Sequence, residues 1–277
     1  MLMETISTNR SFSGTQGVYS HASSMTGTDM AFAVYVPDHA QDAKLPVVWY
    51  LSGLTCTHAN VMEKGEYRRL ASELGLIIVA PDTSPRGEGV PDDPSYDMGQ
   101  GAGFYVDATQ EPWNDHFQMR SYIEQELPAL IADHFPADME RQGIFGHSMG
   151  GHGALTIALR NPDRFKSASA FSPIVAPIEC PWGKKALGRY LGEDQAAWRD
   201  YDACALIEDG ARFPDLLVDQ GAGDDFLEEQ LKPQLLVDAC EKASIPLTLN
   251  IHDGYDHSYF FISTFMEDHL RWHAERL

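Results

Sequence analysis

The stretch that decides the fold is Gln142-Gly143-Ile144-Phe145-Gly146-His147-Ser148-Met149-Gly150-Gly151-His152-Gly153-Ala154-Leu155. It contains Gly146-x-Ser148-x-Gly150, the pattern of a nucleophile elbow, in which a serine occupies a sharp turn between a strand and a helix. The apolar pair Ile144-Phe145 enters the motif like the end of a buried strand. The apolar run 154–159 leaves it like a helix, which Asn161-Pro162 stops.

A serine in so tight a turn has a strained backbone, and the strand and helix beside it must pass close together. Gly146, Gly150 and Gly151 supply residues without side chains for this approach. The same geometry turns the Ser148 hydroxyl outward and places the Met149 amide at a helix N-terminus, where it can bind an oxyanion. Because a solvated serine in a plain tight turn also fits the pattern, the catalytic interpretation depends on an acid and a histidine farther along the chain.

Length and composition indicate one globular domain. The chain has 277 residues, of which 43% are hydrophobic and 22% charged, so we expect a single domain over residues 1–277. The formal net charge of −21 argues against nucleic acid and anionic membrane surfaces as partners. A small anionic substrate stays compatible with it, because salt screens surface charges beyond about 8 Å.

The N-terminal residues and the cysteines bear on location and metal binding. Residues 1–6 lack the basic segment and apolar core of a signal peptide, and no apolar run approaches the roughly 20 residues that span a bilayer. We therefore expect a cytoplasmic protein. Cys56, Cys180, Cys204 and Cys240 lie far apart without metal-ligand spacing, which favours free thiols and predicts neither a metal site nor a cofactor.

Strands and helices are expected to alternate along most of the chain, which predicts an α/β fold with a mainly parallel sheet covered by helices on both faces. Tyr122, Leu127, Leu130 and Ile131 are the expected core contacts of one helix. We expect two antiparallel strands within 17–36, strands at 45–51, 76–80, 144–145, 167–172, 216–219 and 247–252, and helices at 63–74, 117–135, 154–159 and from Tyr259.

Two insertions interrupt this alternation. The stretch of about 83–116 is rich in Gly, Pro and Asp, and long irregular loops are often functional, so we predict that it forms a wall of the active site. Within it, Gly99-Gln100-Gly101-Ala102-Gly103 lacks the strand and helix of a dinucleotide site, and the acidic run 92–97 lacks the spacing of a calcium loop. A second, cap-like insertion is expected at about 174–205.

A hydrolase with this elbow places an acid and then a histidine after the serine, on loops at the same sheet edge. His252 falls within an expected strand, whereas His269 and His273 fall within the terminal helix. His257 occupies a loop directly after a strand, so it is the expected catalytic histidine.

Three aspartates compete for the role of the acid. Asp225 has Glu228 three residues on and is expected to form a capping box for the turn at Phe226. Asp219 lies closest to the strand end, and Asp224 lies where a loop carboxylate could reach His257. Position favours Asp224 over Asp219 only modestly.

Five stretches together resemble the S-formylglutathione hydrolase (esterase D) family of α/β-hydrolases, and the match runs nearly end to end. The resemblance implies the α/β-hydrolase fold, a triad of Ser148, Asp224 and His257, and a Leu54 amide that joins that of Met149 in the oxyanion hole. The stretches are Ser52–Thr57, Gly101–Tyr105, Gly146–Leu155, Asp219–Gly221 with Asp224-x-Phe226-Leu227, and Tyr255–Phe261.

The activity implied by the resemblance is hydrolysis of S-formylglutathione to glutathione and formate, the second step of glutathione-dependent formaldehyde removal. The resemblance also implies a homodimer. Cys56 is implied to lie near the substrate, although a buried inert thiol fits the sequence equally well. Trp182, Lys184 and Lys185 could contact glutathione, and a solvated lysine pair fits as well.

Two other functions fit the same motifs. One is a broad carboxylesterase, or a feruloyl or acetyl-xylan esterase, although such secreted enzymes normally carry a signal peptide. The other is a binding protein on a hydrolase scaffold, which would normally lack part of the triad.

Overall fold

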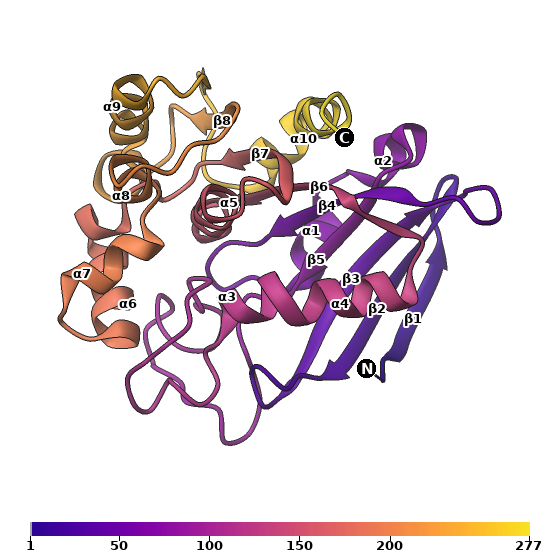
Figure 1. The fold of residues 1–277 in the computed structure, drawn as a ribbon, viewed down its shortest axis with the longest axis horizontal. Helices are drawn as coiled ribbons and strands as arrows, with labels where there is room; N and C mark the ends of the chain where they lie inside the picture. Colours follow the sequence, from indigo (N-terminus) through magenta and orange to yellow (C-terminus); the bar gives the residue numbers. More distant parts are fainter. Residues whose placement is uncertain (1) are drawn as a thin grey trace.

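The computed structural model describes residues 2–277, and a nine-stranded sheet forms its centre (Figure 1). The strand order is β1-β2-β3-β5-β4-β6-β7-β8-β9; β1, β2, β3 and β5 pair antiparallel, and β5, β4 and β6 to β9 pair parallel. The strands are β1 (Glu4–Arg10), β2 (Gly14–Ala22), β3 (Asp29–Pro37), β4 (Leu45–Leu51), β5 (Ile77–Pro81), β6 (Ala137–His147), β7 (Phe165–Phe171), β8 (Leu216–Gly221) and β9 (Leu247–His252).

Helices cover both faces of this sheet, which confirms the predicted α/β fold. On one face Val48 and Tyr50 pack with α1, α2 and α10, and on the other Trp49 packs with α4 and α5. The helices are α1 (His58–Lys64), α2 (Arg68–Leu74), α3 (Met119–Ser121), α4 (Leu127–His134), α5 (Met149–Arg160), α6 (Pro181–Leu191), α7 (Gln195–Trp198), α8 (Ala203–Glu208), α9 (Pro233–Ala243) and α10 (Tyr259–Ala274).

The buried strands match the expectation from sequence. Every residue of β5 is buried, and so is every residue of β4 after Leu45, as the apolar runs predict for parallel strands between two helical layers. The four expected core residues of the 117–135 helix are all fully buried. That helix consists of α3, a π-helical turn (Tyr122–Glu126) and α4.

Two expectations for the elements were wrong. The helix expected over 63–74 is two helices, because the chain turns at Gly65 and Glu66 takes a positive φ of 54°. Strand β1 was not expected at all. Its seven residues are all exposed, so a period-2 apolar pattern is missing, and only pairing with β2 defines it.

The elbow between β6 and α5 has the strained geometry that the motif predicts. Ser148 has φ 57° and ψ −118°, a region that residues other than glycine rarely occupy. A Cβ added at Gly150 would lie 1.9 Å from the carbonyl oxygen of Leu51, and one at Gly146 would lie 2.3 Å from that of Gly150. Side chains at these positions would separate α5 from the neighbouring strands.

Both insertions lie at one end of the sheet, beside each other (Figure 1). Between β5 and α3 the described chain is irregular apart from one bridge of Asp107 with Gln118. This loop is tied to α6, since the amide of Thr109 donates to the carbonyl of Tyr190 at 2.8 Å. The other insertion is helical, with α6, α7 and the start of α8.

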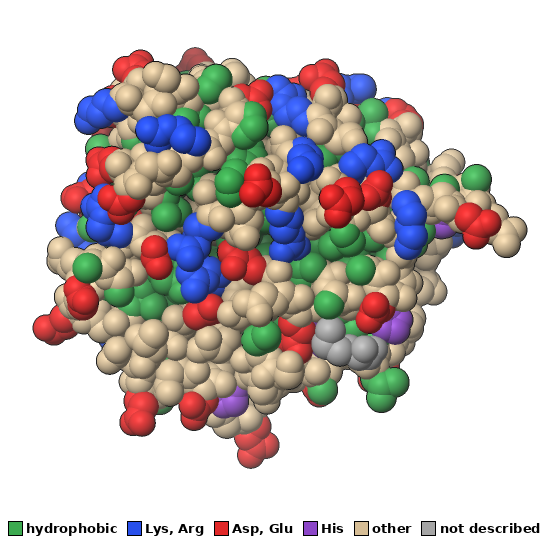
Figure 2. All heavy atoms as spheres, in the orientation of Figure 1, with side chains coloured by type: hydrophobic (Ala, Val, Ile, Leu, Met, Phe, Trp, Pro, Cys, Tyr) green, Lys and Arg blue, Asp and Glu red, His purple; other side chains and the backbone are tan. Residues whose placement is uncertain are grey.

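Charged side chains of both signs are interspersed over the face shown in Figure 2, and acidic ones project from its lower edge. The net charge of −21 is therefore distributed over many separate side chains. Neighbouring basic residues locally offset it, as where Arg199 pairs with Glu208 and Asp209.

Candidate active site

Ser148 opens into a cavity of about 200 Å³ at the carboxyl ends of the parallel strands. The elbow holds its backbone in place, because its amide donates to the carbonyl of Phe171 at 2.9 Å. The cavity is lined by Gly53, Leu54, Thr55, Cys56, Tyr96, His147, Ser148, Trp182, Phe226 and His257.

His257 and Asp224 form a hydrogen-bonded pair beside Ser148. The Nδ1 atom of His257 lies 2.5 Å from Oδ2 of Asp224, whose side chain is fully buried. Burial alone would raise the pKa of Asp224, but hydrogen bonds from His257, the Phe226 amide and Gln220 outweigh it and lower the pKa below its ordinary value. Asp224 is therefore an anion that accepts a hydrogen bond from Nδ1–H of His257, which leaves Nε2 pointing away from the carboxylate.

Within residues 2–277 the Ser148 hydroxyl makes no hydrogen bond to His257, although both line the cavity. Hydrogen bonds between catalytic groups often shorten only when substrate is bound. The ring of His147 contacts that of His257, with centroids 4.4 Å apart. Burial, reinforced by His257, holds the pKa of His147 well below its ordinary value, so His147 is a neutral neighbour.

The two expected oxyanion donors belong to residues close to Ser148. The Met149 amide begins α5, and the Leu54 amide follows Gly53, where an added Cβ would lie only 3.2 Å from Cβ of Ser148. As the first residue of α5, Met149 has an amide that the regular hydrogen bonds of the helix leave free. Leu54 lines the cavity together with Ser148, and Met149 follows Ser148 directly, so the two amides belong to different segments beside the nucleophile.

Of the expected substrate contacts, Cys56 and Trp182 line the cavity and Lys184 does not. Lys184 is exposed on α6, and Lys185 pairs with Asp97 at 2.6 Å. Burial raises the pKa of the Cys56 thiol, so this cysteine is a neutral group and not an activated nucleophile. All four cysteines are free thiols, as expected.

Sequence reasoning missed Tyr96, His147 and Phe226 as cavity residues. Trp182 Nε1 donates to the Tyr96 hydroxyl at 3.1 Å, so each insertion contributes one side chain to this wall. The ring of Phe226 lies 4.7 Å from that of Trp182 and 5.1 Å from that of His257. Phe226 belongs to a motif that resembles the family pattern, Asp224-x-Phe226-Leu227, and this could have identified it as a site residue. No sequence pattern identifies Tyr96.

Asp219, the rival acid, lies outside this cavity. It sits within β8, where Asn250 Nδ2 donates to its carboxylate at 2.8 Å and Nε2 of His252 lies 3.1 Å from it. The expected capping role of Asp225 was wrong, because Phe226 is the N-cap of the turn Leu227–Leu231 and no side chain caps it.

A chain of buried polar groups runs from Asp219 into α10. Nε2 of His269 lies 3.6 Å from Asp219, and its Nδ1 contacts the Ser169 hydroxyl at 2.8 Å. That hydroxyl also contacts His273 Nε2 at 3.0 Å, and Ser167 contacts His273 Nδ1 at 2.6 Å. Burial lowers the pKa of both histidines, so they pack as neutral groups.

We expect the protein to lose stability as the pH falls below about 6.5. Burial lowers the pKa of His152 from 6.5 to about 4 and also lowers those of His269 and His273. Between pH 6.5 and about 4, the His152 side chain binds a proton in the unfolded chain but not in the folded protein. Each such histidine therefore lowers the free energy of unfolding by up to about 1.4 kcal/mol per pH unit. Urea unfolding at several pH values measures this slope.

The matched variant for this experiment is His152→Gln, which keeps a buried donor for the carbonyl of Phe104 but does not titrate. Its stability should decline less steeply than that of the unmodified protein. A free energy of unfolding that stays constant from pH about 7 to about 5 would contradict this account.

Two features are absent from residues 2–277. No group of three or more His, Cys, Asp or Glu side chains has a geometry suited to a metal ion. Nor does any helix there combine the length and apolar character needed to cross a membrane.

Comparison with known proteins places the chain among esterases. The Esterase family model matches residues 23–272. An S-formylglutathione hydrolase of Paracoccus denitrificans is 56% identical over 274 residues, covering 99% of this chain and 98% of the relative. The S-formylglutathione hydrolase of Mus musculus is 50% identical over 281 residues, covering 100% and 99%.

Solved structures agree with this. The structure of an S-formylglutathione hydrolase from Agrobacterium tumefaciens is 66% identical, with a TM-score of 0.97 and 99% of each chain covered. A ferulic acid esterase at 18% identity has a TM-score of 0.75 over 96% of this chain and 99% of the other, which is a likeness of fold alone. On its full-length identity to these relatives, the chain belongs to the S-formylglutathione hydrolase family of α/β-hydrolase esterases.

Proposed function

We propose that this protein hydrolyses S-formylglutathione to glutathione and formate, with Ser148 as nucleophile, His257 as general base and acid, and Asp224 as the carboxylate that orients His257. The observation that carries the proposal is the 2.5 Å hydrogen bond between His257 and Asp224 on the wall of the cavity that holds the Ser148 elbow. The substrate comes from the names of relatives that are 50% and 56% identical over nearly the full chain.

The reaction begins when Ser148 Oγ attacks the formyl carbon and His257 Nε2 takes the serine proton. Asp224 stabilises the imidazolium that results. The carbonyl oxygen becomes an oxyanion, to which the amides of Leu54 and Met149 donate. Two donors in place before the reaction stabilise this charge without reorganisation, and losing one such donor typically costs about 10²–10³ in rate.

Breakdown of the tetrahedral intermediate breaks the bond between carbon and sulfur, and the glutathione sulfur takes the proton from His257. A water molecule then attacks the formyl ester of Ser148 while His257 accepts its proton. The second intermediate expels Ser148 Oγ, which regains that proton, and formic acid leaves and gives its proton to water, so that formate is the final product. His257 thus gives up each proton that it takes, and the enzyme returns to its starting state.

The small cavity supports a formyl substrate. Its volume of about 200 Å³ is shared by the acyl group and the sulfur, and the rings of Trp182 and Phe226 form one wall. We propose that Cys56 and Trp182 contact the bound substrate, because both line this cavity. A larger acyl group would meet these side chains.

Acyl size gives the test of this proposal. The kcat/KM for S-formylglutathione should exceed that for S-acetylglutathione by about 10- to 200-fold, because one extra methyl group must fit beside fixed rings. S-lactoylglutathione should be slower still. Steady-state kinetics with these thioesters and p-nitrophenyl acetate measure the preference, with Ser148→Ala as the blank.

Comparable kcat/KM values for p-nitrophenyl acetate and S-formylglutathione would contradict the proposed substrate. They would favour the alternative of a broad carboxylesterase. The assignment of Ser148 and His257 would be unaffected by that outcome, because both reactions use the same nucleophile.

We also propose a role in formaldehyde removal in the cytoplasm, as a homodimer of single-domain chains. The hydrolysis of S-formylglutathione consumes the thioester formed after formaldehyde combines with glutathione. The loop insertion 83–116 and the cap-like insertion 174–205 serve as walls of the site. The role in formaldehyde removal is tested by the formaldehyde sensitivity of a strain lacking the gene. The cytoplasmic location is tested by cell fractionation. Sedimentation tests the dimer, and a single calorimetric transition tests the single domain.

A further inference from the structure

The loop that carries the Leu54 amide is strained, and its conformation needs support. We call residues 53–57 the oxyanion loop. Within it Thr55 has a φ of 66°, an unfavourable value for a β-branched residue. The amide of Cys56 donates to the carbonyl of Gly53 at 3.3 Å and closes a turn around Leu54. The position of Cys56 therefore determines the position of the Leu54 amide.

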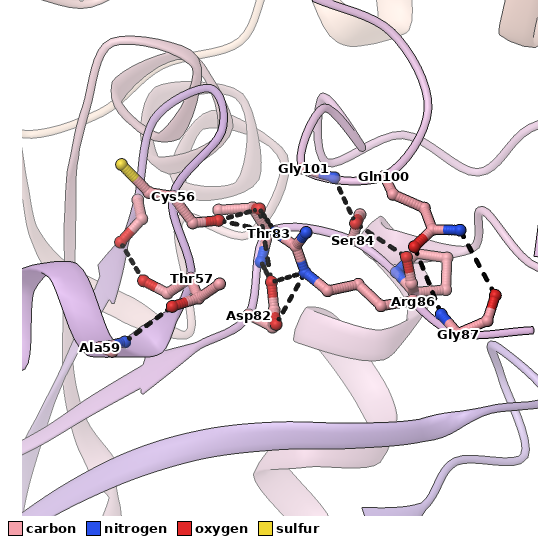
Figure 3. A network of polar contacts seen from close by, with 12 residues as sticks. Cys56, Thr57, Ala59, Asp82, Thr83, Ser84, Arg86, Gly87, Gln100 and Gly101 are labelled. Atoms are coloured by element: carbon pink, nitrogen blue, oxygen red, sulfur yellow. Dashed lines mark hydrogen bonds and ion pairs between the residues drawn. The ribbon is translucent and has the colours of Figure 1, made fainter. Parts of the chain in front are cut away.

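Two side chains outside the loop hold the carbonyl oxygen of Cys56 (Figure 3). The Thr83 hydroxyl donates to this oxygen at 2.6 Å, and Nη2 of Arg86 donates to it at 3.0 Å. On the other side of the strained residue, the Thr55 amide donates to the carbonyl of Gly101 at 2.9 Å. Residues 83–101 thus fix the oxyanion loop on both sides of Thr55.

Arg86 is itself held by Asp82, at the end of β5. Its Nε lies 3.0 and 3.1 Å from the two carboxylate oxygens of Asp82, and the same carboxylate accepts the Thr83 amide at 2.6 Å. The Asp82 side chain is 9% exposed and that of Arg86 is 33% exposed. Because β5 is a central strand beside β4, this arrangement ties the oxyanion loop to the sheet.

We propose that Arg86 and Thr83 are positioning residues for the oxyanion hole, in that they hold the Cys56 carbonyl and thereby aim the Leu54 amide at the developing oxyanion. This inference rests on the proposed function of Leu54. Neither residue is among those lining the cavity. Their effect must therefore appear in the stabilisation of the transition state and not in the binding of substrate.

The test uses Thr83→Val and Arg86→Gln, each of which removes one donor to the Cys56 carbonyl. Thr83→Ser keeps the hydroxyl and is the conservative control. Arg276→Gln is the matched control, because Arg276 forms a similar pair with Asp215 at 2.7 Å, away from the cavity. Thr83→Val changes few atoms, so it provides a second variant if Arg86→Gln folds poorly.

We expect Thr83→Val and Arg86→Gln to lower kcat by about 10- to 100-fold with little change in KM, because a small misplacement of a catalytic group has effects of this size. The inhibition constant of trifluoroacetone, whose adduct with Ser148 places an oxyanion in the hole, should rise by the same factor. It should stay unchanged in Thr83→Ser and Arg276→Gln. An inhibition constant does not depend on the fraction of enzyme that is folded, so a purely structural role would leave it unchanged.

Unchanged trifluoroacetone inhibition in both Thr83→Val and Arg86→Gln would overturn the proposal. The assays use p-nitrophenyl acetate as well as S-formylglutathione, because both need the oxyanion hole. If the unmodified enzyme showed no preference for the thioester, the proposed substrate would fail. A parallel loss of ester hydrolysis and trifluoroacetone binding in the two variants would still support the positioning role.

Discussion

Ser148→Ala is expected to lower kcat/KM for S-formylglutathione by about 10⁴- to 10⁶-fold without unfolding the protein. The reason is that the covalent route disappears together with its nucleophile. In the chain from residue 2 on, the Ser148 hydroxyl has no hydrogen-bond partner, whereas its amide and carbonyl hold the elbow. Removing one oxygen should therefore leave the melting temperature nearly unchanged. Steady-state kinetics and thermal unfolding followed by circular dichroism measure the two effects.

His257→Ala should lose activity to a similar extent, because Ser148 then has no base. Since the two residues act as a unit, the double variant should be only slightly slower than either single one. Losses that multiplied in the double variant would mean that the two side chains act independently, contrary to the proposed mechanism.

Asp224→Asn is expected to lower kcat by about 10⁴-fold, the next largest effect. An amide in place of the carboxylate can present an N–H to His257 Nδ1, which would place the imidazole proton on Nε2, where the base must be free. The substitution also removes the negative charge that stabilises the imidazolium. Steady-state kinetics over a range of pH test this, because the loss should persist at every pH at which the protein is folded.

Asp219→Asn is the matched control for this experiment. Asp219 is another buried aspartate with histidine partners, and its pKa is likewise lowered, by His269 and Asn250 against the effect of burial. We expect the variant to keep its kcat and to melt at a lower temperature. If Asp219→Asn abolished turnover while Asp224→Asn did not, the assignment of the acid would be wrong.

Much of this fold follows from local sequence. The elbow motif predicted the turn from β6 to α5. Its glycines identify it, because no residue with a side chain fits where the backbones of Leu51 and Gly150 come so close. The apolar runs of β4 and β5 predicted central strands. Strand β1 was not predictable, since exposed polar residues form a strand there only through pairing with β2.

The site was predictable to the extent that chain order determines it. His257 follows from its loop after β9, but spacing left Asp219 and Asp224 nearly equal as the acid. What separates them is the length of β8, which extends to Gly221 and keeps Asp219 inside the sheet. Tyr96 and the contacts of Arg86 depend on the path of a long irregular loop, which no periodic pattern encodes.

The buried chain from Asp219 to Ser167 has a single direction. A carboxylate only accepts, so the charge of Asp219, 3.6 Å from Nε2 of His269, favours the tautomer with its proton on that nitrogen and leaves Nδ1 to accept from the Ser169 hydroxyl. Ser169 then accepts from His273 Nε2, and His273 Nδ1 accepts from Ser167. The same tautomer is thereby favoured in each imidazole, and one negative charge in β8 orders the protons of four side chains on β7 and α10.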